Sequence, residues 1–169
     1  MDAAALRAMQ APIKERYRND PTAGLVTLKA HGSLDDGNIA CKVETGRALA
    51  VAGLHPATGG SGLELCSGDM LLEALVACAG VTLKAVSTAL EIPLRGASVS
   101  AEGDLDFRGT LGVDKEAPVG FAEIRLRFDV DTDAGQDKLD QLLKLTERYC
   151  VVYQTIRNGP KVEVTLARA

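Results

Sequence analysis

The sequence predicts an α+β fold in which antiparallel strands are gathered around separate helices. Strand-like runs form two blocks, 23–51 and 97–131, and do not alternate regularly with helices as in a parallel βαβ fold. A nearly all-apolar helical pattern separates the blocks, and an amphipathic one follows them. The 169 residues are 46% hydrophobic and 25% charged, which suits a single core. We expect an N-terminal helical extension over 1–22 and one domain over 23–169.

The first third of the chain is predicted to form a helix and a three-stranded meander. Apolar residues recur near helical spacing from Asp2 to Tyr17, and the sequence Asn19-Asp-Pro21 stops the helix. From Ala23 to Val51, β-branched residues come in short runs that are broken at 31–37 and again at 44–46. Tight turns at these two breaks would join the three strands.

The middle of the chain is predicted to hold a buried helix behind a glycine-rich loop. The loop covers 55–62 and leads toward Ser67-Gly-Asp69, a plausible helix N-terminus. The helix expected from Asp69 to Leu90 is apolar on nearly every face. It should therefore be buried in the domain or in an oligomer.

The last third of the chain is predicted to form a hairpin, an amphipathic helix and a final strand. Apolar residues alternate in 97–107 and 121–131, which indicates an antiparallel hairpin with one wet face. Leu139, Leu142, Leu143 and Leu145 share one side of a helix over 136–149. Alternation over Lys161 to Leu166 predicts the last strand.

Composition and charge exclude several classes of function. A net charge of −4, a pI near 5.2 and the lack of Trp argue against a nucleic-acid partner. No apolar stretch is expected to reach the length of a membrane span, and the first residues do not read as a signal peptide. We expect a cytoplasmic protein without membrane association, whose four cysteines are thiols in a reducing compartment.

Several candidate sites have plain structural explanations. The glycine-rich loop lacks the lysine of a phosphate loop, so we expect an ordinary turn. His31 and His55 have no close cysteine at zinc spacing, so we expect surface loop residues and no metal site. Asp69 and Glu73 suit the start of a helix, where carboxylates interact favourably with the helix dipole. Glu73 nevertheless needs a partner if the helix buries it.

Each cysteine has two interpretations, because a free cysteine commonly behaves as a small buried hydrophobe. Cys41 lies in a strand-like run and Cys66 ends a loop, and neither has an electrostatic helper nearby in sequence. We therefore assign both a structural role. Cys78 lies in an apolar helix, which raises the pKa of a thiol, so reactivity would require a cation and hydrogen-bond donors supplied by the fold.

Three motifs follow one another along the chain, Gly59-Gly60, Ser67-Gly-Asp-Met-Leu-Leu-Glu-Ala-Leu-Val-Ala-Cys-Ala-Gly-Val-Thr-Leu83 and Glu147-Arg-Tyr-Cys150. In this order they resemble the OsmC/Ohr family of osmotically inducible and organic hydroperoxide resistance proteins. The resemblance covers roughly 23–166, and the segment 13–21 is similar to the lead-in of one OsmC-like branch.

The resemblance implies a dithiol peroxidase that reduces organic hydroperoxides without a cofactor. Cys78 would be the peroxidatic thiol, Cys150 the resolving thiol, and Asp69 the carboxylate that holds an activating arginine. The family implies antiparallel sheets around a buried central helix in an intertwined homodimer. It also implies an external dithiol reductant, often a lipoylated protein. With Leu71, Leu72, Leu75 and Val76 around Cys78, we expect an apolar pocket that favours bulky organic peroxides over hydrogen peroxide.

The chain departs from the family pattern at two positions. The turn where relatives carry the arginine reads Ser33-Leu-Asp35, so Arg18, Arg47 or Arg157 would have to replace it. Val151 follows Cys150, where many relatives have proline. The missing arginine keeps a second hypothesis open, a non-catalytic OsmC-like dimer that binds a small apolar or thiol-bearing ligand at its interface.

Overall fold

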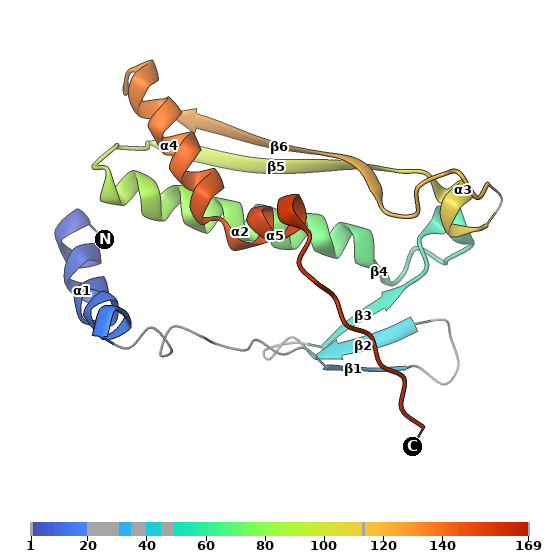
Figure 1. The fold of residues 1–169 in the computed structure, drawn as a ribbon. Coiled ribbons are helices and arrows are strands. Elements are labelled where there is room, and N and C mark those ends of the chain that lie inside the picture. Colours follow the sequence, from blue (N-terminus) through green and yellow to red (C-terminus); the bar gives the residue numbers. More distant parts are fainter. Residues whose placement is uncertain (1, 20–30, 35–39, 45–48, 113, 169) are drawn as a thin grey trace.

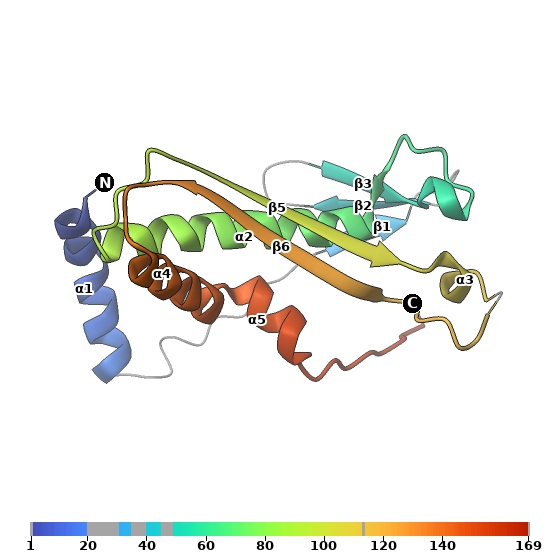
Figure 2. The ribbon, with the colours of Figure 1, turned by 90° about the horizontal axis from the view of Figure 1, so that it is seen from above.

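The structure is a computed structural model that describes residues 2–19, 31–34, 40–44, 49–112 and 114–168. Two layers flank a long central helix, with a β-hairpin running along it and two shorter helices packed beside it (Figure 1, Figure 2). The helices are α1 (Ala3–Asn19), α2 (Ser67–Ala89), α3 (Phe107–Thr110), α4 (Gln136–Tyr149) and α5 (Val151–Asn158), with a short 3₁₀ helix η2 (Pro56–Thr58). The strands are β1 (His31–Leu34), β2 (Ala40–Glu44), β3 (Leu49–Gly53), β4 (Leu65–Cys66), β5 (Gly96–Leu105) and β6 (Phe121–Asp131).

The small sheet confirms the predicted meander but shifts its strands. Strands β1, β2 and β3 pair antiparallel in order, and β4 joins β3 in parallel. β1 occupies His31–Leu34, where we expected a break, so the prediction that His31 lies in a loop was wrong. The strand expected before residue 31 lies outside the described residues. Cys66 closes β4 and caps α2, so it belongs to a strand end and not to a loop.

The central helix forms where the apolar run predicts it, but the single chain buries only one of its faces. That face packs against β5, α4 and α5, while the exposed fraction of Val81 on another face is 73%. Glu73 is exposed, so its carboxylate needs no buried partner here. The buried residues of α2 are Leu75, Ala79, Leu83, Val86 and Ser87.

Helix α2 is also long and apolar enough to cross a membrane, by length and composition alone, with a mean hydropathy of 1.7 over its best window. The expectation that no segment reaches this length was therefore wrong. The charged residues of α2 are Asp69, Glu73 and Lys84, and the 18-residue window that meets the criterion holds no more than two of them. A core helix of a soluble protein meets the same criterion, so this single helix is weak support for a membrane span.

The hairpin and α4 complete the main core. Strands β5 and β6 pair antiparallel, with Leu126, Phe128 and Val130 turned inward and charged residues outward, as predicted. Helix α4 has the predicted bounds, but Leu143 is 45% exposed and the buried Thr146 takes its place on the inner face. The buried cluster consists of Leu83, Val86, Ile92 and Leu142.

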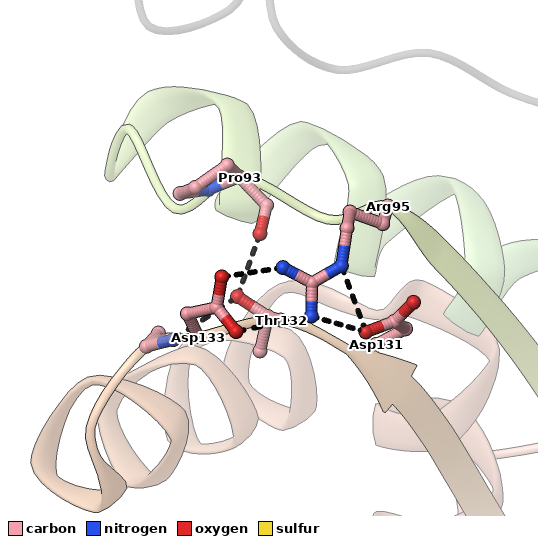
Figure 3. A network of polar contacts seen from close by, with 6 residues as sticks. Pro93, Arg95, Asp131, Thr132 and Asp133 are labelled. Carbon is pink, nitrogen blue, oxygen red and sulfur yellow. Dashed lines mark hydrogen bonds and ion pairs between the residues drawn. The ribbon is translucent and has the colours of Figure 1, made fainter.

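A group of exposed polar contacts joins the start of β5 to the end of β6. The Arg95 guanidinium donates to Asp131, with Nε to Oδ1 at 3.0 Å, and also to Asp133 (Figure 3). Beside it, the Thr132 hydroxyl donates to the Pro93 carbonyl at 2.6 Å. These contacts link the turn after α2 to the turn before α4, and they fix where α4 starts relative to the central helix.

The last segment of the chain differs most from the prediction. Residues 151–158 form α5, which we did not predict, because Val151 and Val152 are β-branched and favour strands. The sequence does carry stop signals for this helix, with Gly159 in the left-handed region at φ 49° and Pro160 next. The strand expected over 161–166 does not form, because this segment pairs with no strand of the described residues. Its apolar side chains are exposed to solvent.

Candidate active site

The structure brings together the two cysteines that the sequence singles out. Cys78 lies in the middle of α2 and Cys150 is the single residue between α4 and α5. The two thiols lie close enough for each to shift the pKa of the other. Cys150 is 1% exposed, whereas Cys78 is half-buried, so only Cys78 offers its sulfur to a molecule from solution.

The end of α4 determines where Cys150 lies. The N–H of Cys150 donates to the carbonyl of Thr146 at 3.0 Å, which is the last backbone bond of α4. Cys150 itself is extended, with φ −73° and ψ 107°, so the chain turns and α5 begins in a new direction. The N–H of Gln154 then donates to the Cys150 carbonyl at 3.0 Å and closes the first turn of α5.

The N-terminus of α5 points its free N–H groups at the two sulfurs. The N–H groups of Val151 and Val152 donate to Cys78, while those of Tyr153 and Val152 donate to Cys150. The first N–H groups of a helix have no partner within it, and they carry the positive end of the helix dipole. They therefore form a ready site for a thiolate.

These contacts shift the pKa values of the two thiols in opposite directions. Burial raises the pKa of Cys78, but the nearby Val152 N–H, Cys150 thiol and Val151 N–H outweigh it, so the net pKa is lowered. Burial also raises the pKa of Cys150, where the Tyr153 N–H opposes it and the neighbouring Cys78 adds to it. The net pKa of Cys150 is raised. Cys78 therefore ionises first, and Cys150 keeps its proton.

The N-terminus of α5 lowers the pKa of Cys78, which is the role that we expected of an arginine. Among the described residues, the nearby groups that lower the pKa of Cys78 include backbone N–H groups and the Cys150 thiol, and none is a guanidinium. The Thr82 hydroxyl donates to the Cys78 carbonyl at 2.7 Å. The Arg157 guanidinium contacts the Tyr153 hydroxyl at 3.3 Å and lies over its ring. The Arg18 side chain and Arg47 lie outside the described residues. The sequence analysis missed the N–H donors because it did not predict α5.

The structure does not bring Asp69 to the thiols. Asp69 lies in the first turn of α2, and the helix rise puts it roughly 13 Å from Cys78 along the axis. It lines a separate cavity of about 360 Å³, together with His55, Cys66 and Phe107. Its role as the carboxylate that holds an arginine stays a prediction.

The remaining candidates have structural roles. His55 stacks on Phe107 with ring centroids 4.9 Å apart, and its Nδ1 accepts the N–H of Ala57 at 3.0 Å. The glycine-rich loop is a turn closed by its own backbone bonds, and a Cβ on Gly60 would lie 1.7 Å from the Leu54 carbonyl oxygen. Within the described residues, no group of three or more His, Cys, Asp or Glu side chains is arranged to hold a metal ion. Cys41 lies in β2.

A largely apolar cavity of about 460 Å³ lies between β6, α4 and α5, and neither Cys78 nor Cys150 is among the residues that line it. Its walls come mainly from β6 and α5, and α2 contributes Leu75, which lies one turn before Cys78. Of the four α2 residues expected around a pocket, only Leu75 lines this one. Leu72 lines the separate cavity near Asp69. Polar groups of Glu147, Tyr153 and Arg157 also line it.

The lowered pKa of Cys78 predicts a distinctive pH profile for alkylation. Because the thiolate is the reacting form, Cys78 should be alkylated by iodoacetamide well below pH 8.5, the ordinary pKa of a thiol, where glutathione reacts slowly. Cys150, with a raised pKa and a buried sulfur, should react last. Mass spectrometry of the cysteine peptides after timed alkylation from pH 5 to pH 9 measures both. A Cys78 profile that coincides with glutathione would contradict the geometry of the α5 N-terminus.

Comparisons with known proteins agree with this architecture. Residues 60–165 match the family model described as OsmC-like protein. A search of curated proteins found no match. The fold is similar to an OsmC-like protein from Mycoplasma pneumoniae, at 14% identity and a TM-score of 0.65 over 79% of this chain and 89% of that one.

Two further solved structures have names that refer to hydroperoxides. One is an organic hydroperoxide resistance protein OsmC from Legionella pneumophila, at 18% identity and a TM-score of 0.61 over 80% of this chain and 93% of that one. The other is the organic hydroperoxide resistance protein OhrB of Bacillus subtilis, at 18% identity and a TM-score of 0.52 over 78% and 93%. At these identities the likeness shows the α+β fold alone. The family match covers more than half of the chain and includes both thiols, so the chain belongs to the OsmC-like protein family.

Proposed function

We propose that the protein is a cytoplasmic thiol-dependent peroxidase that reduces organic hydroperoxides in defence against oxidative stress. The observation that carries the proposal is the Cys78–Cys150 pair, in which two thiols far apart in the sequence lie close together, with the pKa of Cys78 lowered and the pKa of Cys150 raised. The family includes proteins named for organic hydroperoxide resistance, which supports the same reading.

In the first step, the Cys78 thiolate attacks the terminal peroxide oxygen. A sulfur–oxygen bond forms and the oxygen–oxygen bond breaks, and the alkoxide takes up from water the equivalent of the proton that Cys78 released on ionising, so that it leaves as the alcohol. Sulfur is oxidised to a sulfenic acid and the hydroperoxide is reduced. The N–H groups of Val151 and Val152 hold the thiolate in place before the attack.

In the second step, Cys150 attacks the sulfenic sulfur of Cys78. A disulfide forms, and the sulfenic hydroxyl leaves with the Cys150 proton as water. An external dithiol, such as a lipoylated protein, then exchanges with the disulfide, which restores both thiols and oxidises the carrier. The closeness of the two thiols supports this step, since the resolving group already lies near its target.

The proposed substrates are bulky organic hydroperoxides. The cavity that Leu75 lines, one turn before Cys78, is large enough for a ring or a short alkyl chain, and its walls also include Phe121 and Ile124. An apolar group that enters it leaves water and contributes binding energy that hydrogen peroxide lacks.

We further propose that the protein works as a homodimer. The exposed apolar side chains of α2 and of 162–166 support this, because such surfaces are usually covered by a partner. Sedimentation equilibrium should give twice the chain mass, and a monomer at micromolar concentration would contradict the assembly.

The direct test is turnover by the reduced protein. With dithiothreitol as donor, it should consume cumene hydroperoxide faster than hydrogen peroxide. One equivalent of cumene hydroperoxide without donor should remove two thiols and yield a disulfide-linked peptide pair containing Cys78 and Cys150. Failure to consume either peroxide rules out the proposed activity, and equal rates on both rule out the role of the apolar cavity.

A second candidate function is binding of a small apolar ligand without catalysis. The observation in its favour is that no guanidinium among the described residues bonds the Cys78 sulfur, while the apolar cavity is present. This binder would take up a hydrophobic fluorescent probe and release it to competing apolar molecules, yet would leave peroxide unchanged. Thiol loss on peroxide addition separates the two candidates.

A further inference from the structure

Cys150 alone separates α4 from α5, so the angle between these helices depends on contacts that cross the junction (Figure 2). One such contact comes from the side chain of Gln154. Its Nε2 donates to the carbonyl oxygen of Glu147 at 2.8 Å, in a half-buried position. This hydrogen bond ties the first turn of α5 to the last turn of α4.

The Glu147 carbonyl is where an unbroken helix would use the Val151 N–H. In a continuous α-helix each N–H donates to the carbonyl four residues earlier, and for Val151 that residue is Glu147. Here no backbone bond joins the Val151 N–H to the Glu147 carbonyl, and this N–H instead lies close enough to the Cys78 sulfur to lower the pKa of the thiol. The carbonyl freed by this change accepts from the Gln154 side chain, which takes the place of the missing donor.

The carboxamide of Gln154 is held in the orientation that this contact needs. A carbonyl can only accept, so the amide must present its NH₂ end to Glu147. Asn158 supplies the complementary contact, because its Nδ2 donates to the Gln154 Oε1 at 2.8 Å and to the Gln154 carbonyl at 3.0 Å. In the series of contacts from Asn158 through Gln154 to Glu147, every donor group therefore meets an acceptor.

We propose that Gln154 is a positioning residue of the dithiol site, which caps the Glu147 carbonyl and so reserves the Val151 N–H for the Cys78 sulfur. It acts through the backbone and not on the substrate. Without the cap, the Glu147 carbonyl competes with the sulfur for the same N–H, and α4 tends to continue through Cys150. This role deepens the proposed peroxidase function and rests on it, since it makes Cys78 the reacting thiol.

The test compares Gln154→Met, which keeps the side-chain length and removes the donor, with Gln141→Met on the exposed face of α4. Alkylation of the Cys78 peptide is followed against pH in the full-length reduced protein. In Gln154→Met the profile should move to higher pH and the rate at pH 7 should fall about five-fold, the typical effect of one hydrogen bond. Gln141→Met should keep the wild-type profile.

A second readout separates positioning from general destabilisation. In the wild type, the ¹⁵N–¹H resonance of Val151 should titrate together with Cys78, and in Gln154→Met it should no longer do so. If Gln154→Met does not fold, Asn158→Ala removes only the contacts to Gln154 and should shift the profile in the same direction by less. Unchanged profiles in the folded variants overturn the role of Gln154. A wild-type Cys78 that titrates as an ordinary thiol instead overturns the proposed function itself.

Discussion

Replacing Cys78 by serine is expected to lower the rate of organic hydroperoxide reduction by on the order of a thousand-fold or more. A serine hydroxyl is not ionised near neutral pH, and its oxygen cannot accept the peroxide oxygen as a thiolate sulfur does. The measurement is the initial rate of cumene hydroperoxide loss with dithiothreitol, for reduced wild-type and Cys78→Ser proteins at the same concentration.

Cys66→Ser provides the matched control for this substitution. Cys66 is also half-buried, but it caps the start of α2 beside the separate cavity near Asp69. Its replacement should leave the rate close to that of the wild type. Wild-type turnover by Cys78→Ser, or equal losses in both variants, would mean that the chemistry does not depend on the α2–α5 site.

Replacing Leu142 by alanine is expected to lower the free energy of unfolding by about 2–5 kcal/mol. Leu142 is 2% exposed and packs in the buried cluster with Leu83, Val86 and Ile92. The smaller side chain loses its transfer free energy and leaves a cavity between α2 and α4. Urea unfolding followed by circular dichroism measures the change.

The neighbouring residue gives the control for this prediction. Leu143 is 45% exposed, so Leu143→Ala removes little buried surface and should cost less than about 1 kcal/mol. Comparable losses from both substitutions would show that α4 does not present Leu142 to the core in solution as it does here.

Much of the fold could be predicted from local patterns. The apolar run of α2, the alternation in β5 and β6, and the leucines of α4 each carry their period in the sequence, and these elements formed close to the predicted bounds. The predictions were wrong where the conformation of a segment depends on its neighbours in the fold. The alternating tail at 161–166 has no strand to pair with among the described residues, and the two valines of α5 favour strands until the junction at Cys150 starts a helix.

The candidate site was predicted in part. The resemblance to the OsmC/Ohr family named Cys78 and Cys150, and the structure brings their thiols close enough for each to shift the pKa of the other. We expected an arginine to ionise Cys78, because charge is visible in a sequence and a backbone N–H is not. The donors turned out to be the N–H groups of Val151 and Val152.

By itself, the sequence determined the α+β class, the order of most elements and the two thiols, because hydrophobic period and residue type are local properties. The tertiary structure decided which thiol is acidic. That choice depends on how α5 meets α2, on the single-residue junction at Cys150, and on the N–H groups that this junction frees. The pKa of a thiol depends on burial and on donors within a few ångströms, and only the folded chain brings these donors to Cys78.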